Sequence, residues 1–167
     1  MGIPQVVRAS GAVAQEERYE GDLPVRSLER LREALASPDA VLQVRLQARS
    51  LGGYPQLSGT IGGRLPLLCR RCDKPYEWPL EMHLALRLVE NEDQERALMQ
   101  DADPYWVQDD QLPLREIVED EVLLALPMLP RCETCENIVQ AAPTPVVEVA
   151  AVRRENPFAA LKERLKK

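Results

Sequence analysis

Two stretches of strict alternation dominate the chain. Glycine or apolar residues take every second position from Gly59 to Leu67, and large apolar residues do so from Tyr76 to Leu88. A period of two residues is typical of strands with one buried face. The segment between them reads LLCRRCDKPYEW, so the pattern predicts a long β-hairpin whose turn carries Cys69 and Cys72.

A third strand precedes this hairpin. Residues 41–49 alternate in the same way, and a Gly-Gly-Tyr-Pro turn separates them from the hairpin. Successive strands joined by short turns pair antiparallel. The three stretches therefore predict an antiparallel sheet or partial barrel.

Two segments have helical spacing instead. Residues 24–36 carry an apolar stripe, with Asp22 placed to cap a helix and Pro24 in its first turn. Residues 113–126 carry a second stripe, with Leu114, Ile117 and Val122 facing a core. The predicted fold class is therefore α+β: an antiparallel β-sheet or partial barrel with two packed helices, a Cys-x-x-Cys hairpin knuckle and a C-terminal tail helix.

The remaining segments set the domain organisation. Residues 1–21 are weakly patterned, residues 90–103 predict an acidic mobile surface loop or a contact for a basic partner, and residues 104–107 predict a short edge strand. We expect one domain over residues 1–140 that carries both cysteine pairs, then a Pro/Ala-rich linker over 141–155. Residues 156–167 predict a short basic C-terminal helix, which is marginal alone and orders only on docking or on a partner.

The charge of the chain is unevenly distributed. It has 21 basic and 27 acidic residues, net −6, which argues against indiscriminate coating of nucleic acid. Residues 90–121 hold 12 acidic and 2 basic residues, net −10, whereas residues 64–74 sum to +3 and residues 153–167 to +4. We therefore expect any anion to bind at one of these two basic segments and not over the whole surface.

The compartment follows from what the sequence lacks. The first 18 residues have no apolar core of a secretory signal, and no run approaches the roughly 20 apolar residues of a membrane span. We therefore expect a cytoplasmic protein without a membrane partner. In that reducing compartment, four cysteines in two close pairs favour metal over disulfide.

The two Cys-x-x-Cys pairs are the strongest candidate site. Four thiolates suit a tetrahedral structural Zn²⁺. The resulting Zn(Cys)4 centre has a net charge of −2, which adjacent basic side chains can offset. The candidate ligands are Cys69, Cys72, Cys132 and Cys135, and the basic neighbours are Arg70, Arg71, Lys74 and Arg131. The pairs are 59 residues apart, against about 15–20 in compact zinc sites. Two free dithiols, a disulfide or an iron–sulfur cluster remain alternatives.

Catalysis has little support in the sequence. A thioredoxin-like pair needs a helix N-terminus after a strand, whereas Cys69–Cys72 lies between strands and Cys132–Cys135 follows a predicted helix. The single histidine, His83, falls on the polar side of a strand, and no glycine-rich phosphate loop is present. We therefore predict a protein that is not an enzyme and has no small-molecule substrate.

The hairpin turn is also a candidate RNA-binding surface. Arg70, Arg71, Lys74 and Arg131 can contact phosphate, and Tyr76 and Trp78 can stack on a base. The alternative for both rings is a place in the core, because they share a strand face with Leu80 and Leu84.

Three motifs carry a family resemblance. They are Leu68–Cys72 with Lys74–Tyr76, the run Val118–Pro127, and Asn156–Ala159 before the final Leu-Lys. With them, the chain resembles the YceD family, the large-ribosomal-RNA-subunit accumulation proteins of bacteria and plastids. The resemblance implies a role in synthesis, processing or stability of 23S rRNA, hence large-subunit assembly, and no known catalytic residue.

Under this resemblance the charges divide into two surfaces. The knuckle and the basic tail are expected to touch 23S rRNA or a pre-50S particle, and the acidic helix to meet a basic large-subunit ribosomal protein. The expected partner-binding residues are Glu119, Asp120, Glu121, Asn156, Pro157 and Phe158. The alternatives are an acidic adaptor that does not contact RNA, and a thiol redox or zinc-holding protein.

Overall fold

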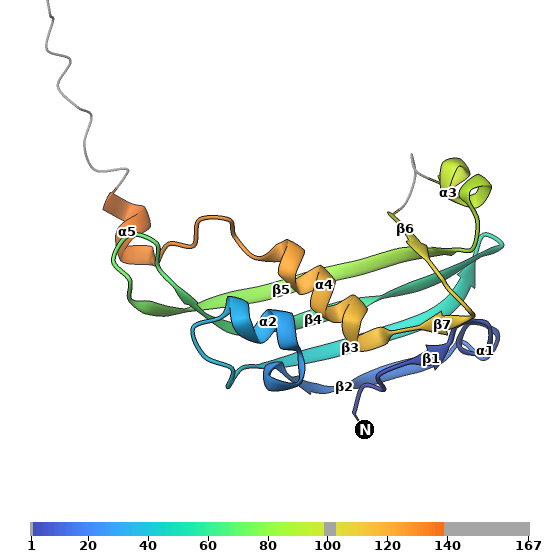
Figure 1. Cartoon of the computed structure of the whole chain (residues 1–167), viewed down its shortest axis with the longest axis horizontal. Coiled ribbons are helices and arrows are strands. Elements are labelled where there is room, and N and C mark those ends of the chain that lie inside the picture. The colour runs from blue at the N-terminus through green and yellow to red at the C-terminus, as the bar shows by residue number, and fades with distance from the viewer. Residues whose placement is uncertain (1, 99–102, 139–167) are drawn as a thin grey trace, which may run out of the picture.

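The computed structural model describes residues 2–98 and 103–138. Its body is a five-stranded sheet in the spatial order β2-β3-β4-β5-β6, and a small two-stranded sheet pairs β1 with β7. The strands are β1 (Val7–Arg8), β2 (Arg18–Pro24), β3 (Val41–Leu51), β4 (Tyr54–Leu68), β5 (Pro75–Val89), β6 (Asp103–Trp106) and β7 (Gln111–Leu112). The helices are α1 (Ala9–Ala14), the 3-10 turn η1 (Val25–Ser27), α2 (Glu29–Ala34), α3 (Glu92–Leu98), α4 (Leu114–Ala125) and α5 (Glu133–Ile138) (Figure 1).

The predicted hairpin is confirmed. β4 and β5 pair antiparallel from Gln56 opposite Arg87 to Leu68 opposite Pro75. β3 pairs antiparallel with β4 on the other side, as predicted from its alternation. The cysteine-bearing turn therefore lies at one end of the longest ladder in the described structure.

Three glycines allow β3 and β4 to pair. Gly52 and Gly53 take φ values of 63° and 83° in the turn between β3 and β4, a region that only glycine enters freely. At Gly59, a Cβ atom would lie 1.9 Å from the carbonyl oxygen of Arg45, so β3 approaches β4 too closely for any side chain.

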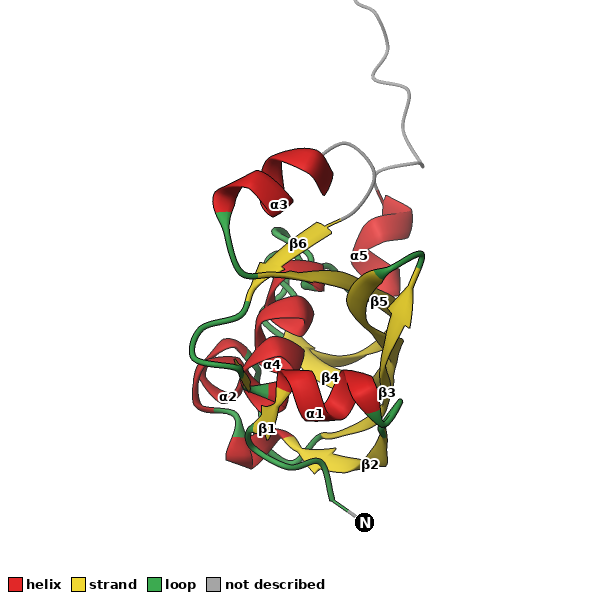
Figure 2. Ribbon diagram, turned by 90° about the vertical axis from the view of Figure 1, so that its right-hand side faces the viewer, coloured by secondary structure: helices red, strands yellow, loops and turns green. Residues whose placement is uncertain are grey.

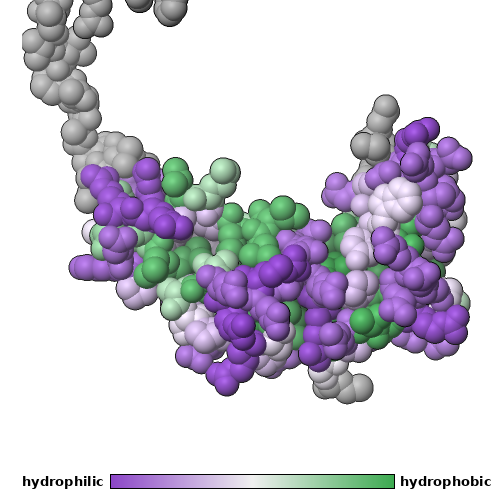
Figure 3. Space-filling view, viewed as in Figure 1, coloured by the Kyte–Doolittle hydropathy of each residue, from purple (hydrophilic) through white to green (hydrophobic). Residues whose placement is uncertain are grey.

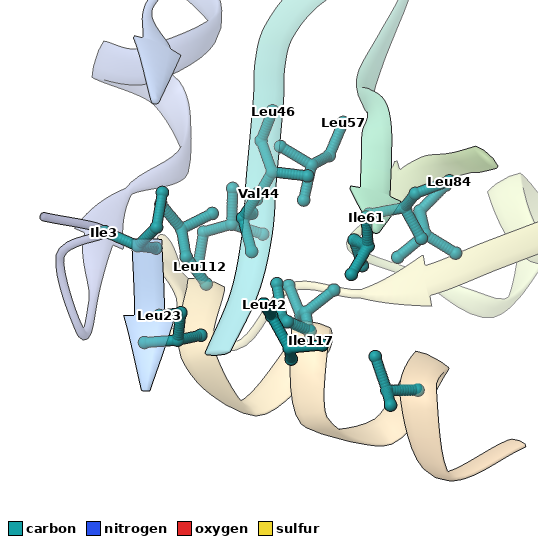
Figure 4. Packing of buried hydrophobic residues seen from close by; sticks show 14 of the residues in the cluster. Ile3, Leu23, Leu42, Val44, Leu46, Leu57, Ile61, Leu84, Leu112 and Ile117 are labelled. Carbon is teal, nitrogen blue, oxygen red and sulfur yellow. The ribbon is translucent and has the colours of Figure 1, made fainter. Parts of the chain in front are cut away.

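One face of the sheet carries the core. Figure 2 shows α2 and α4 on the same side of the sheet, and Figure 4 shows Leu42, Ile61 and Ile117 packed between sheet and helix. The alternate side chains of the strands face away and are mostly polar. Burial of one face explains why the period of two was so clear in the sequence.

The predicted helix over residues 24–36 is wrong in its first half. Asp22 and Pro24 belong to β2, where they pair with Gln43 and Val41. The backbone then forms η1, and α2 starts only at Glu29. The apolar residues of the stripe are still buried, because strand, 3-10 turn and helix all turn the same positions toward the core.

The weakly patterned N-terminus is structured as well. It forms β1, α1 and the edge strand β2, which pairs with β3 from Arg18 to Pro24. A carboxylate far along the chain holds α1: Asp110 accepts hydrogen bonds from the Ser10 amide and hydroxyl, at 2.7 and 2.6 Å. Such long-range pairing leaves little local pattern in the sequence.

The acidic stretch over residues 90–103 is not simply a loop. Its described part contains α3, which the Asn91 side chain caps by accepting a hydrogen bond from the Gln94 amide. Acidic residues in the first turn favour this helix through its dipole, and Glu92 pairs with Arg96 one turn later. The helix therefore corrects the prediction of a loop.

Two further predicted elements are confirmed. α4 matches the predicted helix, and β6 is the predicted edge strand, although it runs parallel to β5. The fold is α+β with a mostly antiparallel, open sheet. The predicted linker over 141–155 and tail helix over 156–167 lie outside the described residues.

A membrane-spanning helix is not found among the described residues, since none of their helices is both long and apolar enough.

Candidate metal centre

The first cysteine pair lies in a tight turn at the end of the hairpin. The Cys69 amide donates to the Lys74 carbonyl, and the Asp73 amide donates back to the Cys69 carbonyl, at 3.0 and 2.9 Å. Asp73 takes a positive φ of 55°, which reverses the chain after Cys72. The turn therefore places both thiols on its inner side, with Cys69 fully buried and Cys72 half-buried.

The second pair lies at the start of α5. The amides of Cys135 and Glu136 both donate to the Cys132 carbonyl, each at 3.0 Å, which begins the helix. One helical turn brings residues three apart to the same side, so both sulfurs point the same way. Cys135 is 6% exposed and Cys132 is half-buried.

The fold brings the two turns together, as predicted. The Arg70 amide donates to the carbonyl of Pro130 at 2.9 Å, which ties the hairpin to the segment before α5. Figure 1 shows α5 beside the turn between β4 and β5. All four sulfur atoms lie within 4.8 Å of one another, and the sulfurs of Cys72 and Cys132 are 3.8 Å apart.

These distances fit a tetrahedral metal ion. A zinc–sulfur bond of about 2.3 Å implies sulfur–sulfur edges of about 3.8 Å in a regular tetrahedron. All four thiols are free, and 3.8 Å is far longer than a disulfide bond of about 2.05 Å. Cys69, Cys72, Cys132 and Cys135 can therefore hold one metal ion of the kind that prefers four thiolates.

The thiols differ in acidity in the absence of metal. The backbone N–H of Cys132, helped by those of Arg71 and Cys72, lowers the pKa of Cys69 to about 6. Burial, together with the neighbouring thiols, raises the pKa of Cys135 to about 12. The cluster therefore offers one sulfur that ionises easily and one that a cation must stabilise.

The predicted basic residues surround this centre and reach solvent. Arg70, Arg71, Lys74 and Arg131 are all exposed. Three exposed carboxylates stand beside them in sequence, on Asp73, Glu133 and Glu136. The hairpin turn is therefore more basic than the start of α5.

The two aromatic residues do not form an open stacking platform. Trp78 is half-buried and packs against the core cluster, as the core alternative predicted. Tyr76 is also half-buried; burial, followed by the nearby Cys69 thiol, raises its pKa. Neither ring is therefore fully open for stacking on a base.

The second cysteine pair differs in local structure from what the sequence predicted. Cys132–Cys135 was expected merely to follow a helix, yet Cys132 directly precedes the first residue of α5. Glu133 and Glu136 are acidic residues of the kind that is typical of a first helical turn, and they could have indicated that a helix starts here. Because the pair follows a coil segment and its sulfurs meet the other pair, the surroundings still differ from those of a strand–helix redox motif.

The acidic face of α4 is less exposed than expected. Glu119 is 6% exposed, and both its carboxylate oxygens are engaged inside the protein, by Arg30 and by the Leu31 amide. Glu119 therefore offers almost no surface to a partner. Asp120 is half-exposed and pairs with Arg30, and Glu121 is partly exposed.

The other predicted residues complete the comparison. His83 is exposed on the polar face of β5, as predicted. Asn156, Pro157 and Phe158 lie outside the described residues. The ion pair between Glu119 and Arg30 was not predicted, because the two residues are 89 positions apart and no local sequence pattern indicates that they meet.

Comparison with known proteins agrees with the family resemblance. A profile described as "Large ribosomal RNA subunit accumulation protein YceD" matches residues 57–164. A protein of Haemophilus influenzae with that same name is 32% identical over 150 residues, which cover 86% of this chain and 84% of the relative. No solved structure gives a significant match. The chain therefore belongs to the YceD family.

Proposed function

We propose that the protein is a non-catalytic factor that supports the accumulation of 23S rRNA by binding rRNA or pre-50S particles in the cytoplasm. The family is named for accumulation of the large ribosomal RNA subunit, and this name indicates the process in which we propose that the protein acts. The contact with RNA would be made by the four exposed basic side chains around the partly buried cysteine cluster. Zinc bound by the four cysteines is the structural cofactor in this proposal.

The main support for an RNA contact is the way in which the backbone of the turn holds Arg70 and Arg71 in place. They lie between two metal-ligand positions, and the Arg70 amide is bonded to Pro130. A turn fixed at both ends loses little conformational entropy when its side chains bind phosphate. Guanidinium groups also match the geometry of phosphate oxygens better than lysine does.

An acidic adaptor that contacts only proteins is the second candidate. It is favoured by the acidic neighbours of the knuckle and by Asp120 and Glu121 on α4. The basic partner would be a large-subunit ribosomal protein. The two candidates differ in whether the knuckle arginines touch RNA.

Charge reversal in cells separates them. We would replace the chromosomal gene by Arg70→Glu/Arg71→Glu and, as a matched control, by Arg18→Glu/Arg32→Glu, which makes the same charge change at two exposed arginines outside the knuckle. The readouts are the ratio of 23S to small-subunit rRNA and ultraviolet crosslinking of the protein to RNA. The proposal expects both to fall for the knuckle variant alone. Wild-type crosslinking and rRNA ratio in that variant would refute it.

A further inference from the structure

An exposed apolar patch lies next to the cysteine centre and has no role in the site described above. It comprises Leu124, Met128 and Leu129, which are 82%, 96% and 69% exposed. Leu124 lies in the last turn of α4, and the other two belong to the segment that leads to Cys132. Figure 3 shows hydrophobic surface between α4 and α5. Neighbouring large apolar side chains at such exposure mark an interaction surface.

The surroundings of this patch are acidic. Residues 120–136 contain four carboxylates and a single cation, Arg131, net −3. Asp120 and Glu121 precede Leu124 by four and three residues, so they flank it on the helix surface. Burial, followed by the negative charges of Asp103 and Asp120, raises the pKa of Glu121, so a basic group beside it would stabilise its charged form.

The C-terminal residues of this chain have the complementary chemistry. In residues 156–167, Phe158, Leu161 and Leu165 are spaced three and four apart, which makes one apolar stripe on a helix. The same segment holds four basic residues and one acidic residue, net +3. Its apolar stripe suits the patch, and its charge suits the acidic surroundings.

The connection is long enough for docking within one molecule. The described chain ends at Ile138 in α5, the helix that directly follows the patch. Residues 139–157 span up to roughly 60 Å when extended, more than the roughly 50 Å length of the 15-residue strand β5. A tether of this kind gives an effective concentration on the order of millimolar, so even weak docking is populated.

We infer that residues 156–167 dock on the Leu124–Met128–Leu129 patch of the same chain, with Phe158 and Leu161 against Met128. The docked segment covers the apolar surface and places its basic side chains beside Glu121, because Arg30 already pairs with Asp120. The inference concerns a contact within the protein and does not rest on the proposed RNA function.

Methionine methyl NMR tests this docking on the full-length protein. The chain has four methionines, and Met128→Leu assigns the Met128 signal by its disappearance. We expect Phe158→Ser/Leu161→Ser to move the Met128 methyl resonance to the position of a solvent-exposed methionine. The matched control Val146→Ser/Val149→Ser, which changes two apolar residues of the intervening segment, leaves that resonance in place.

Two results would overturn the inference. An identical Met128 resonance in wild type and in the Phe158/Leu161 variant would show that the segment does not contact the patch. A wild-type shift that disappears on tenfold dilution would show that a second copy, not the same chain, covers it. Both variants leave every residue of the described core unchanged, so we do not expect a loss of folding to confuse the result.

Discussion

Glu119 of α4 caps another helix, α2: its Oε1 atom accepts a hydrogen bond from the Leu31 amide at 3.0 Å. α2 has no side-chain cap of its own, because Leu28 occupies its N-cap position. The other oxygen, Oε2, is held by the Arg30 guanidinium at 3.1 Å. One buried carboxylate thus satisfies an orphan amide of α2 and joins both helices over the sheet.

Removal of the Glu119 charge should therefore lower stability. We expect Glu119→Gln to reduce the free energy of unfolding by about 1–3 kcal/mol, the usual cost of losing charged hydrogen bonds at a buried site. Glu116→Gln is the matched control, since Glu116 is exposed on the same helix. Urea unfolding of both variants measures the difference. Equal stabilities would show that the charge of Glu119 contributes nothing.

Gly59 offers a second test of the fold. A Cβ there would meet the Arg45 carbonyl, so β3 and β4 must separate in Gly59→Ala. We expect a loss of about 2–3 kcal/mol in the free energy of unfolding, typical of steric overpacking. In Gly62→Ala, on the same strand, the new Cβ meets its nearest atom at 3.6 Å, an ordinary contact. That control should remain within about 1 kcal/mol of wild type, and equal losses would contradict the argument.

The elements that the sequence predicted correctly are those whose pattern lies within one short segment of the chain. β3, β4, β5 and α4 each bury one face over nine or more residues, so their period is clear without knowledge of the partner. The two Cys-x-x-Cys pairs were recognisable for a similar reason, because each pair is defined within four residues. Their meeting was inferred from metal chemistry, and the structure brings the sulfurs together.

What was missed depends on contacts between distant residues. β2 exists because it pairs with β3, so Asp22 and Pro24 belong to this strand and not to the start of a helix. Glu119 looked like one of several exposed acids until Arg30 and Leu31, almost ninety positions earlier, were seen to enclose it. No property of Glu119 itself distinguishes it from Asp120 or Glu121 in the sequence.

Asp110 should give the fold a pH-dependent contact. The Ser10 hydroxyl and amide, and then Arg8, hold the pKa of this carboxyl below its ordinary value of 3.8. Its stabilisation is therefore complete above the pKa of the unfolded chain and is lost as the pH falls through the lower folded value. Asp110→Asn keeps a residue that tolerates the positive φ of 58° but removes the charge. We expect a lower melting temperature for this variant at pH 7 and a smaller difference near pH 3; a pH-independent difference would contradict this.

Metal content is the direct test of the cysteine cluster. Protein purified without chelator should contain about one zinc per chain, because all four sulfurs are within reach of one ion. Cys132→Ser/Cys135→Ser should lose the metal, whereas Glu133→Gln/Glu136→Gln, on the same helix, should retain it. The sheet has its own core, so we expect the cysteine variant to remain folded but to lose hydrogen-exchange protection at the Arg70 amide. Metal-free wild type after purification under reducing conditions would contradict the assignment.

Salt dependence distinguishes direct RNA contact from an adaptor role. Each phosphate neutralised on single-stranded RNA contributes about −0.7 to the slope of log affinity against log salt. If Arg70 and Arg71 each neutralise one phosphate, Arg70→Gln/Arg71→Gln should make the slope for a 23S rRNA fragment shallower by about 1.4. Arg18→Gln/Arg32→Gln, which removes the same charge at exposed positions outside the knuckle, should leave the slope unchanged. Equal slopes in all three proteins would mean that the knuckle arginines do not touch phosphate, and the acidic adaptor would then be the better description.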